Sequence, residues 1–163
     1  MTERAPPSAA TKVKIRDCGT DDLEPVMTIM GAAFEPTYGE AWTRSQCAGI
    51  LPMAGVTLRL AERGDGEVAG FALLRAIADE AELLLIAVAP AAQQTGVGAA
   101  LIEDFVALAT ARGARRLHLE VREGNTAIVL YERAGFKLVG RRRDYYRGLD
   151  GRKRDALTLA LDR

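Results

Sequence analysis

Residues 80–112 read EAELLLIAVAPAAQQTGVGAALIEDFVALATAR. The apolar run 83–88, which stops before Pro90, predicts a strand that is covered on both faces. A turn that contains Gly96 and Gly98 then leads into a segment whose apolar side chains recur at the spacing of an amphipathic helix. A glycine-bearing turn between a strand and a helix presents successive backbone amides, and the positive end of the helix dipole, to an anion. The segment therefore predicts a phosphate-binding loop.

Two well-known phosphate loops do not fit this spacing. A nucleotide P-loop continues from its last Gly into Lys and then Ser or Thr, whereas Ala99 follows Gly98 here. The dinucleotide fingerprint needs a third Gly where Leu101 stands, and it follows the first strand of a sheet. A tight turn that packs a helix closely on a sheet would also use glycine, so the turn alone leaves a purely structural role open.

Length and composition narrow the class of protein. The chain has 163 residues and a mass of 17.5 kDa, as expected for one domain with one core. Because 22 basic side chains balance 22 acidic ones, charge does not indicate a nucleic acid or a membrane as partner. No apolar run reaches the roughly 18 residues that a membrane span needs. Residues 1–11 read as a disordered leader without the apolar region of a signal peptide, so we expect a single domain over 12–163 in a cytoplasmic protein.

Cysteine and histidine are scarce. Cys18 and Cys47 are too few for a disulfide framework and are not spaced as metal ligands, so we expect two reduced thiols. His118 is the only histidine, which argues against a His-based metal site. We expect no bound metal.

The rest of the chain alternates between strand and helix patterns. Thr20-Asp21-Asp22 supplies helix N-caps, Thr43-x-x-Gln46 forms a capping box, and Gly113 ends the helix that follows the loop. The expected strands cover residues 13–16, 56–62, 67–76, 83–88, 117–121, 137–142 and 156–161, and the expected helices cover 20–34, a segment from 43, the segment before Gly113, and 126–134. Strands and helices in this order predict a three-layer α/β domain.

Several short motifs in the second half carry a resemblance to a known family. They are Gln93-x-x-Gly96-x-Gly98, Ile86-Ala87-Val88, Leu119-Glu120-Val121-Arg122, Asn125, Leu130-Tyr131-Glu132-Arg133-Ala134-Gly135-Phe136, Arg142-Arg143-x-Tyr145-Tyr146 and Asp150-Gly151-Arg152. Together they resemble the GNAT superfamily of acyl-CoA-dependent N-acetyltransferases, and within it the bacterial ribosomal-protein-alanine N-acetyltransferases. The resemblance covers about residues 12–162. It implies the GNAT-type three-layer fold, with a mixed, mostly antiparallel sheet of about six to seven strands and about four helices.

The resemblance also implies acetyl-CoA as co-substrate and names residues that would bind it. Their backbone would pair with the pantetheine arm at Ile86, Ala87 and Val88, and hold the pyrophosphate at Gln94, Thr95, Gly96, Val97, Gly98 and Ala99. The family commonly has Arg where Gln94 stands, and Gln keeps a hydrogen bond but loses a charge-assisted contact. Asn125 would contact the cofactor, although the family usually places seven positions between this Asn and the Tyr where the present chain has six.

Two residues match the family's catalytic pair. Glu120 corresponds to the general base and Tyr131 to the general acid, because attack on a thioester needs a neutral amine and departure of the thiolate is helped by a proton donor. The structural alternatives are a solvated carboxylate for Glu120 and a core aromatic for Tyr131. Neither Cys18 nor Cys47 lies in a matched motif, so direct attack in a ternary complex is expected.

The amine that accepts the acetyl group is the part of the reaction that the sequence determines least. We expect a primary amine, in particular the N-terminal α-amine of a protein such as a ribosomal protein. The alternatives are a small-molecule amine or a lysine, or a catalytically idle acyl-CoA- or RNA-binding module on the same fold. Residues 141–154 carry seven basic side chains around Tyr145-Tyr146, which indicates a solvated hairpin, a wall of the peptide groove or, less readily, an RNA contact. Trp42 could face the same groove or anchor the core. The chain could be a monomer or a homodimer.

Overall fold

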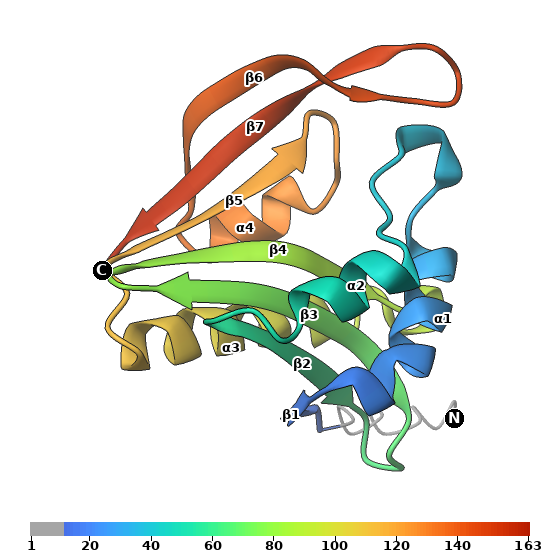
Figure 1. The fold of residues 1–163 in the computed structure, drawn as a ribbon, viewed down its shortest axis with the longest axis vertical. Coiled ribbons are helices and arrows are strands. Elements are labelled where there is room, and N and C mark those ends of the chain that lie inside the picture. The colour runs from blue at the N-terminus through green and yellow to red at the C-terminus, as the bar shows by residue number, and fades with distance from the viewer. Residues whose placement is uncertain (1–11) are drawn as a thin grey trace, which may run out of the picture.

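The computed structural model describes residues 12–163, and the expected leader lies outside the described residues. Its centre is a sheet of seven strands in the order β1-β2-β3-β4-β5-β7-β6 (Figure 1). The strands are β1 (Lys14–Cys18), β2 (Val56–Glu62), β3 (Val68–Ile77), β4 (Glu80–Val88), β5 (Arg116–Arg122), β6 (Lys137–Arg147) and β7 (Lys153–Asp162). Only β4 and β5 run parallel to each other; every other neighbouring pair in this sheet is antiparallel.

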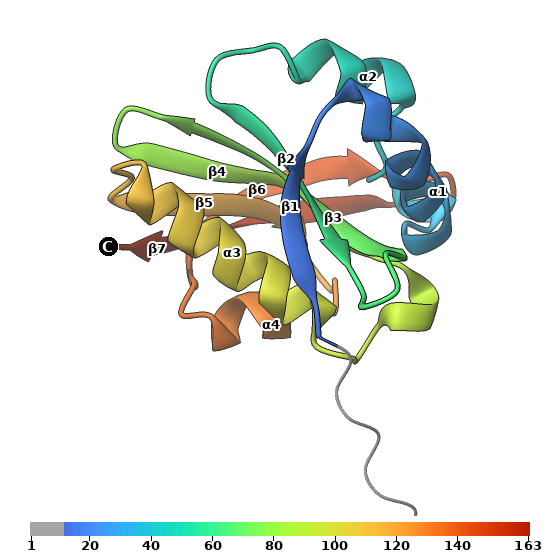
Figure 2. The same ribbon diagram turned by 90° about the horizontal axis from the view of Figure 1, so that it is seen from below.

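Four α-helices cover the two faces of the sheet. They are α1 (Leu23–Ala33), α2 (Arg44–Ile50), α3 (Val97–Ala111) and α4 (Ile128–Arg133). In Figure 2, α1 and α2 lie on one side of the sheet, and α3 and α4 lie on the other. The expected three-layer fold with a mixed, mostly antiparallel sheet is confirmed.

Each face of the sheet buries its own apolar core. The alternation in β5 sends Leu117, Leu119 and Val121 into the core under α3, where Phe105 is fully buried. The second core, under α1 and α2, contains Met30 and the other side chains of that layer. The intervening β5 positions 118, 120 and 122 therefore face the side of α1 and α2. This alternation fixes the direction of the polar side chains at positions 118, 120 and 122 of β5.

The sheet opens where β4 and β5 separate. Their pairing covers only Glu80–Leu83 against Arg116–Leu119, whereas β4 remains paired with β3 up to Val88. Figure 1 shows the two strands diverging from the edge near the C-terminus toward the opposite edge. The last residues of β4 thus have a neighbouring strand on one side only, and the opening between β4 and β5 leads to the start of α3.

Several boundaries differ from those expected. A short 3-10 helix occupies Thr20–Asp22, so α1 begins at Leu23 and not at the caps themselves. The last two strands are longer than expected, because β6 and β7 continue pairing out to Arg147 and Lys153 beyond an irregularity between Arg142 and Tyr146. The capping box at α2 is confirmed: Gln46 N donates to Thr43 Oγ1 at 3.2 Å, and Thr43 N donates to Gln46 Oε1 at 2.7 Å.

The structure also describes the features that bear on a membrane span and on the state of the two cysteines. No helix among residues 12–163 is both long and apolar enough to span a membrane. Cys18 is partly exposed and Cys47 is buried, and both are free thiols.

Glycine at position 70 is required by close packing. A methyl group there would lie 2.8 Å from the carbonyl oxygen of Ala87 and 3.2 Å from Val97 Cγ1, so backbone would have to move. We predict that Gly70→Ala lowers the free energy of unfolding by about 1–3 kcal/mol in urea denaturation. Gly31→Ala is the matched control, because an added methyl on α1 meets nothing within 4 Å, and it should stabilise by up to about 1 kcal/mol. Equal effects of the two variants would contradict this account.

Candidate active site

The start of α3 is open to an anion. Gly96 is the N-cap residue, with φ 91°, and the helix has no side-chain cap within the described part of the chain. The first intrahelical bond runs from Ala100 N to Gly96 O. The N–H groups of Val97, Gly98 and Ala99 precede this bond, so they point out of the helix end without an intrahelical acceptor. Amides and helix dipole together make a site that suits a phosphate group.

The two glycines of the loop have different roles. At Gly96 an added methyl would meet nothing within 4 Å, but the positive φ strains any other residue. At Gly98 the methyl would lie 2.8 Å from Leu130 Cδ2 and 3.6 Å from Val88 Cγ2. Gly98 therefore lets α3 pack closely against α4 and β4, which is the structural role that the sequence had left open. Because Gly96 has no side chain, space remains beside the backbone amides at the start of α3.

The end of β4 adjoins this loop. Residues 86–88 pair with β3 on one side, while the pairing of β4 with β5 ends at Leu83. Backbone groups on the side of the opening are thus available to an extended ligand, which can bind there as an added strand would. This arrangement is compatible with the predicted binding of acetyl-CoA, with its thioester arm beside residues 86–88 and its phosphates at the amides of 94–99.

Glu120 lies on the face of β5 that is directed toward the side of α1 and α2. Its carboxylate oxygen Oε1 forms an ion pair with Arg142 Nε on β6, at 3.0 Å. The Glu120 side chain is 21% exposed and that of Arg142 is 62% exposed. The pair fixes the direction of the carboxylate, and the recorded contact uses only one of its two oxygens.

Tyr131 lies on α4 and is buried in the core with its hydroxyl at the edge. The residue is 5% exposed, and its ring makes an edge contact with Phe136 at 6.3 Å between centroids. Among the described residues no buried polar side-chain atom lacks a hydrogen-bond partner, and the Tyr131 hydroxyl has no recorded bond, so the hydroxyl reaches solvent. Burial raises the pKa of the phenol, and the nearby Glu40 and Tyr146 add to the rise. The phenol therefore holds its proton at neutral pH.

Glu40 is a site residue that no sequence pattern indicated. It lies in the connection between α1 and α2 and accepts a charge-assisted hydrogen bond from Arg122 Nε at 2.6 Å. The side chains are 13% and 11% exposed, respectively. Its second oxygen accepts from Asn125 Nδ2 at 3.4 Å. Asn125 in turn accepts from Ala127 N at 2.9 Å, at the turn before α4. The structure thus directs the Asn125 side chain to Glu40 and to the helix start.

Tyr38 extends this cluster. The Arg122 guanidinium lies 3.7 Å from the centre of the Tyr38 ring, and that of Arg154 lies 4.7 Å from it, both within the range of cation–π attraction. Nearby, the Leu149 N–H donates to the carbonyl of Thr37 at 2.9 Å. The connection between α1 and α2 is thus joined to the turn between β6 and β7. The two segments form a bridge at the end of the opening.

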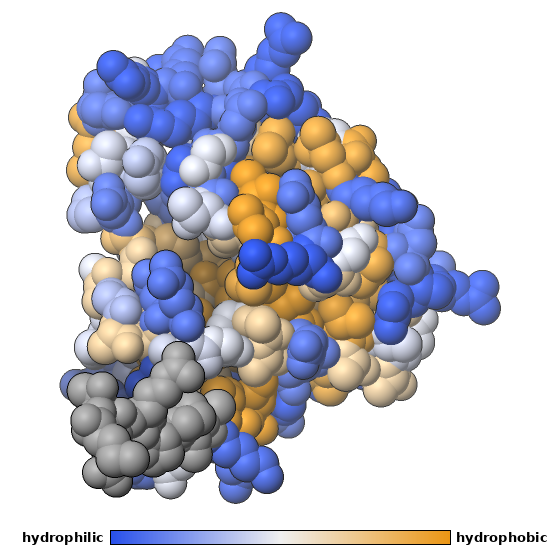
Figure 3. All heavy atoms as spheres, turned by 180° about the vertical axis from the view of Figure 1, so that it is seen from behind, coloured by the Kyte–Doolittle hydropathy of each residue, from blue (hydrophilic) through white to orange (hydrophobic). Residues whose placement is uncertain are grey.

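Three of the seven basic side chains in segment 141–154 pair with acidic neighbours within the described residues. Arg141 pairs with Glu123 and Asp155, each at 2.7 Å, and Arg154 pairs with Asp150 at 2.7 Å. Tyr146 faces the site, where burial first and then Glu40 and Glu120 raise its pKa to about 12. Figure 3 shows the hydrophilic surface of this hairpin at the top and apolar side chains gathered over α3 and α4 below it. These contacts favour a solvated hairpin that also forms a wall of the site.

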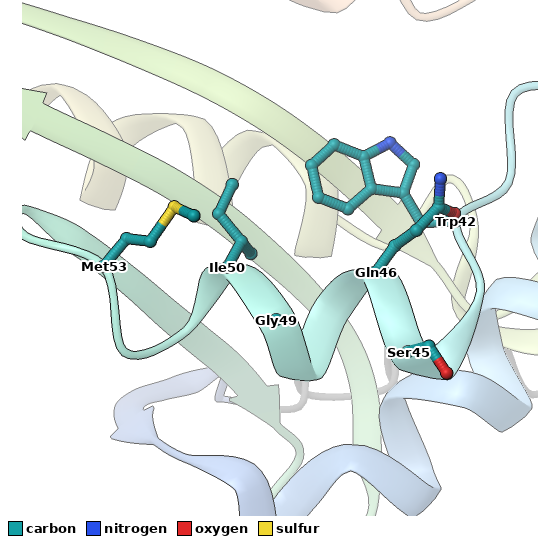
Figure 4. A pocket seen from close by; sticks show the side chains of 6 residues that line it. All are labelled: Trp42, Ser45, Gln46, Gly49, Ile50 and Met53. Carbon is teal, nitrogen blue, oxygen red and sulfur yellow. The ribbon is translucent and has the colours of Figure 1, made fainter.

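Trp42 contributes to both the core and a groove. The indole is half-buried against the core beneath α1 and α2. It also lines an open groove of about 380 Å³ along α2, and Figure 4 shows Trp42, Ile50 and Met53 pointing to the same side of this helix. The complete lining is Trp42, Ser45, Gln46, Gly49, Ile50 and Met53.

The fold and this site together define an acyl-CoA-dependent acetyltransferase. Residues 23–136 match the acetyltransferase (GNAT) family, and the chain belongs to this family. It is an N-acetyltransferase that uses acetyl-CoA.

The names of individual relatives are more specific than the name of the family. A ribosomal protein bS18-alanine N-acetyltransferase of Escherichia coli (strain K12) is 45% identical over 98 residues, which are 60% of this chain and 66% of that relative. The crystal structure of the ribosomal-protein-S18-alanine N-acetyltransferase from Escherichia coli has a TM-score of 0.83 at 34% identity, over 93% of this chain and 94% of that one. A phosphinothricin acetyltransferase from Sinorhizobium meliloti, solved with AcCoA, shares the fold with a TM-score of 0.78 at 21% identity, over 92% and 88% of the two chains.

The phosphate loop can be tested with two glycines of equal strain. We predict that Gly96→Ala loses CoA affinity by tenfold or more in calorimetry, because the methyl group stands beside the exposed amides and the positive φ is strained by about 1–2 kcal/mol. Gly113→Ala is the matched control, since Gly113 has φ 94°, meets nothing within 4 Å, and follows the other end of α3. Gly113→Ala should lose similar stability and keep CoA affinity. Equal CoA affinity of both variants would contradict the assignment of the loop.

The raised pKa of Tyr131 predicts an alkaline loss of stability. An unfolded tyrosine releases its proton near pH 10, whereas the folded phenol releases it only at higher pH. The contribution of the protonated phenol is therefore complete below about pH 10 and is lost as pH rises toward the folded pKa. We expect the free energy of unfolding of Tyr131→Phe to fall less steeply than that of the native protein between about pH 9.5 and 11. Parallel curves in denaturant titrations would show that the phenol does not titrate in this way.

Proposed function

We propose that this enzyme transfers the acetyl group of acetyl-CoA to the N-terminal α-amine of a protein, of the ribosomal-protein-alanine type. The observation that carries the proposal is the early end of the β4–β5 pairing, which leaves the last residues of β4 without a partner on one side, next to the loop at α3. In this proposal the carboxylate of Glu120 and the hydroxyl of Tyr131 act at the same site. The names of the relatives support the acceptor class. An acceptor that is a newly made ribosomal protein implies action in the cytoplasm.

Each cofactor-binding residue has a proposed role that follows from its backbone. Ile86, Ala87 and Val88 would pair with the pantetheine arm along the free side of β4, and the amides of 94–99 would hold the pyrophosphate. Asn125 has a different role in this proposal. Its amide donates to Glu40 and accepts from Ala127 N, so in this proposal it orients the turn before α4. A direct contact of Asn125 with the cofactor stays a prediction.

Bound acetyl-CoA would supply an acetyl thioester. Glu120 would accept the proton of the acceptor amine at its carboxylate, directly or through a water molecule, while Arg142 pairs with the other oxygen. Tyr131, which keeps its proton at neutral pH, would donate that proton to the departing sulfur. No side-chain nucleophile is needed, so the amine attacks directly in a ternary complex.

Proton affinity favours an α-amine over a lysine. An α-amine has a pKa near 8 and a lysine near 10.4, so deprotonation at pH 7.4 costs about 1 kcal/mol for the former and about 4 kcal/mol for the latter. The gap of roughly 3 kcal/mol corresponds to about a hundredfold preference, unless the site lowers the pKa of a lysine. Carboxylates such as Glu120 and Glu40 do the opposite, because they stabilise a bound ammonium group.

The acceptor prediction is tested with matched peptides. A peptide that begins with Ala and contains an internal lysine should be acetylated when its N-terminus is free. The same peptide with a blocked N-terminus should not be labelled. Mass spectrometry distinguishes the two positions, and comparable labelling of lysine in the blocked peptide would overturn the proposed acceptor without affecting membership of the family.

The catalytic pair is tested separately. Glu120→Gln should lower kcat by about a hundredfold or more, most severely at low pH, where the amine most needs to lose a proton. Tyr131→Phe should lower kcat with little change in the KM for acetyl-CoA, because the proton is needed only as the sulfur departs. Glu123→Gln is the matched control, since Glu123 pairs with Arg141 at 2.7 Å but is 49% exposed. Full activity of both Glu120→Gln and Tyr131→Phe from pH 6 to 9 would leave these residues with structural roles only.

A further inference from the structure

The phosphate loop of this enzyme has no cation of its own. Every residue from Gln93 to Ala100 is uncharged, including Gln94. Backbone amides alone can bind a phosphate, but a guanidinium adds charge-assisted hydrogen bonds and specificity for a dianion. The turn between β2 and β3 brings a guanidinium to this loop.

Arg63 is the cation that reaches this loop. Its Nη2 donates to the hydroxyl of Thr95 at 3.0 Å, although the two residues are 32 positions apart. The Thr95 hydroxyl itself donates to the carbonyl of Ala92, so it can only accept from Arg63. The contact therefore has a fixed polarity and places the guanidinium beside the residue that precedes Gly96.

The position of Arg63 is held by the fold. It begins the turn between β2 and β3, where its N–H donates to Glu67 O at 2.9 Å and its carbonyl accepts from Gly66 N at 2.8 Å. A few residues further along β3, the close approach of Gly70 to Ala87 and Val97 fixes this strand against β4 and the first turn of α3. The turn and the loop are thus parts of one packed unit.

The contact with Thr95 leaves most N–H donors of the Arg63 guanidinium unused. Within residues 12–163, Arg63 takes part in no ion pair, and the bond to Thr95 uses one of its five N–H groups. The residue is partly exposed, so a ligand can reach it. An arginine without an acidic partner, next to a row of amides that precede the first helical bond, suits an oxyanion.

We propose that Arg63 is a coenzyme A phosphate-binding residue that supplies, from the β2–β3 turn, the positive charge that Gln94 does not. The phosphate contacted is either the pyrophosphate or the 3′-phosphate of the nucleotide, which share this chemistry. The proposal rests on the use of acetyl-CoA and is independent of the acceptor.

The test is calorimetry of CoA binding to Arg63→Gln at low and high ionic strength. Arg63→Gln should bind CoA roughly three- to tenfold more weakly than the native protein at low salt, and the difference should shrink as salt screens the charge. Adding Gln94→Arg to the Arg63→Gln protein should restore affinity. Binding of 3′-dephospho-CoA identifies the phosphate: an equal loss for both ligands indicates the pyrophosphate, and a loss for CoA alone indicates the 3′-phosphate.

Arg112→Gln is the matched control. Arg112 Nη1 donates to Thr57 Oγ1 at 2.8 Å, which is the same kind of exposed contact and the same change of charge, at the opposite end of α3. This variant should bind CoA as the native protein does. Unchanged CoA affinity of Arg63→Gln at low salt would overturn the proposal. A loss of the same size at every salt concentration would also overturn it, because it would show that Arg63 only ties the turn to the loop.

Discussion

The site depends on hydrogen bonds that the central sheet does not make. Two parallel strands that stay paired satisfy each other's backbone groups along their whole length. Here β4 and β5 pair only as far as Leu83 and Leu119, so the end of β4 keeps groups that need another partner. The same divergence separates Glu120 from the end of β4. A single interruption of the ladder thus frees one side of the proposed binding strand and separates it from the strand that carries the carboxylate.

An ion pair that is mostly shielded from solvent holds the far end of this opening. Arg122 and Glu40 are 82 positions apart, and they join β5 to the connection between α1 and α2. Loss of one member would leave a partly buried charge without its partner, which is more damaging than loss of both. Through Asn125 the pair also reaches the turn before α4, which carries Tyr131. The two elements that bear the proposed acid and base are therefore held by one carboxylate.

The sequence predicted the elements of the structure that are determined by residues close to one another in the chain. The strand, the glycine turn and the helix of residues 80–112 follow from neighbouring residues, and the structure confirms them. Glu40 could not be predicted in the same way, because its partner Arg122 comes close only in the folded chain. For Tyr131 the two interpretations are compatible, since the ring is in the core and the hydroxyl reaches the solvent. The roles of individual residues toward the cofactor stay predictions, whereas the fold and the family are established.

The strand order has a consequence for how the protein is made. β7, which follows β6 in the sequence, is inserted between β5 and β6 in the sheet, and it pairs with β5 over the whole span Arg116–Arg122. During synthesis, the strand that carries Glu120 has an unpaired edge until Lys153–Asp162 have left the ribosome. Such an edge is a template for pairing with other chains. The sheet of the nascent enzyme is therefore incomplete, and most exposed to aggregation, until the ten residues of β7 are available to pair with β5.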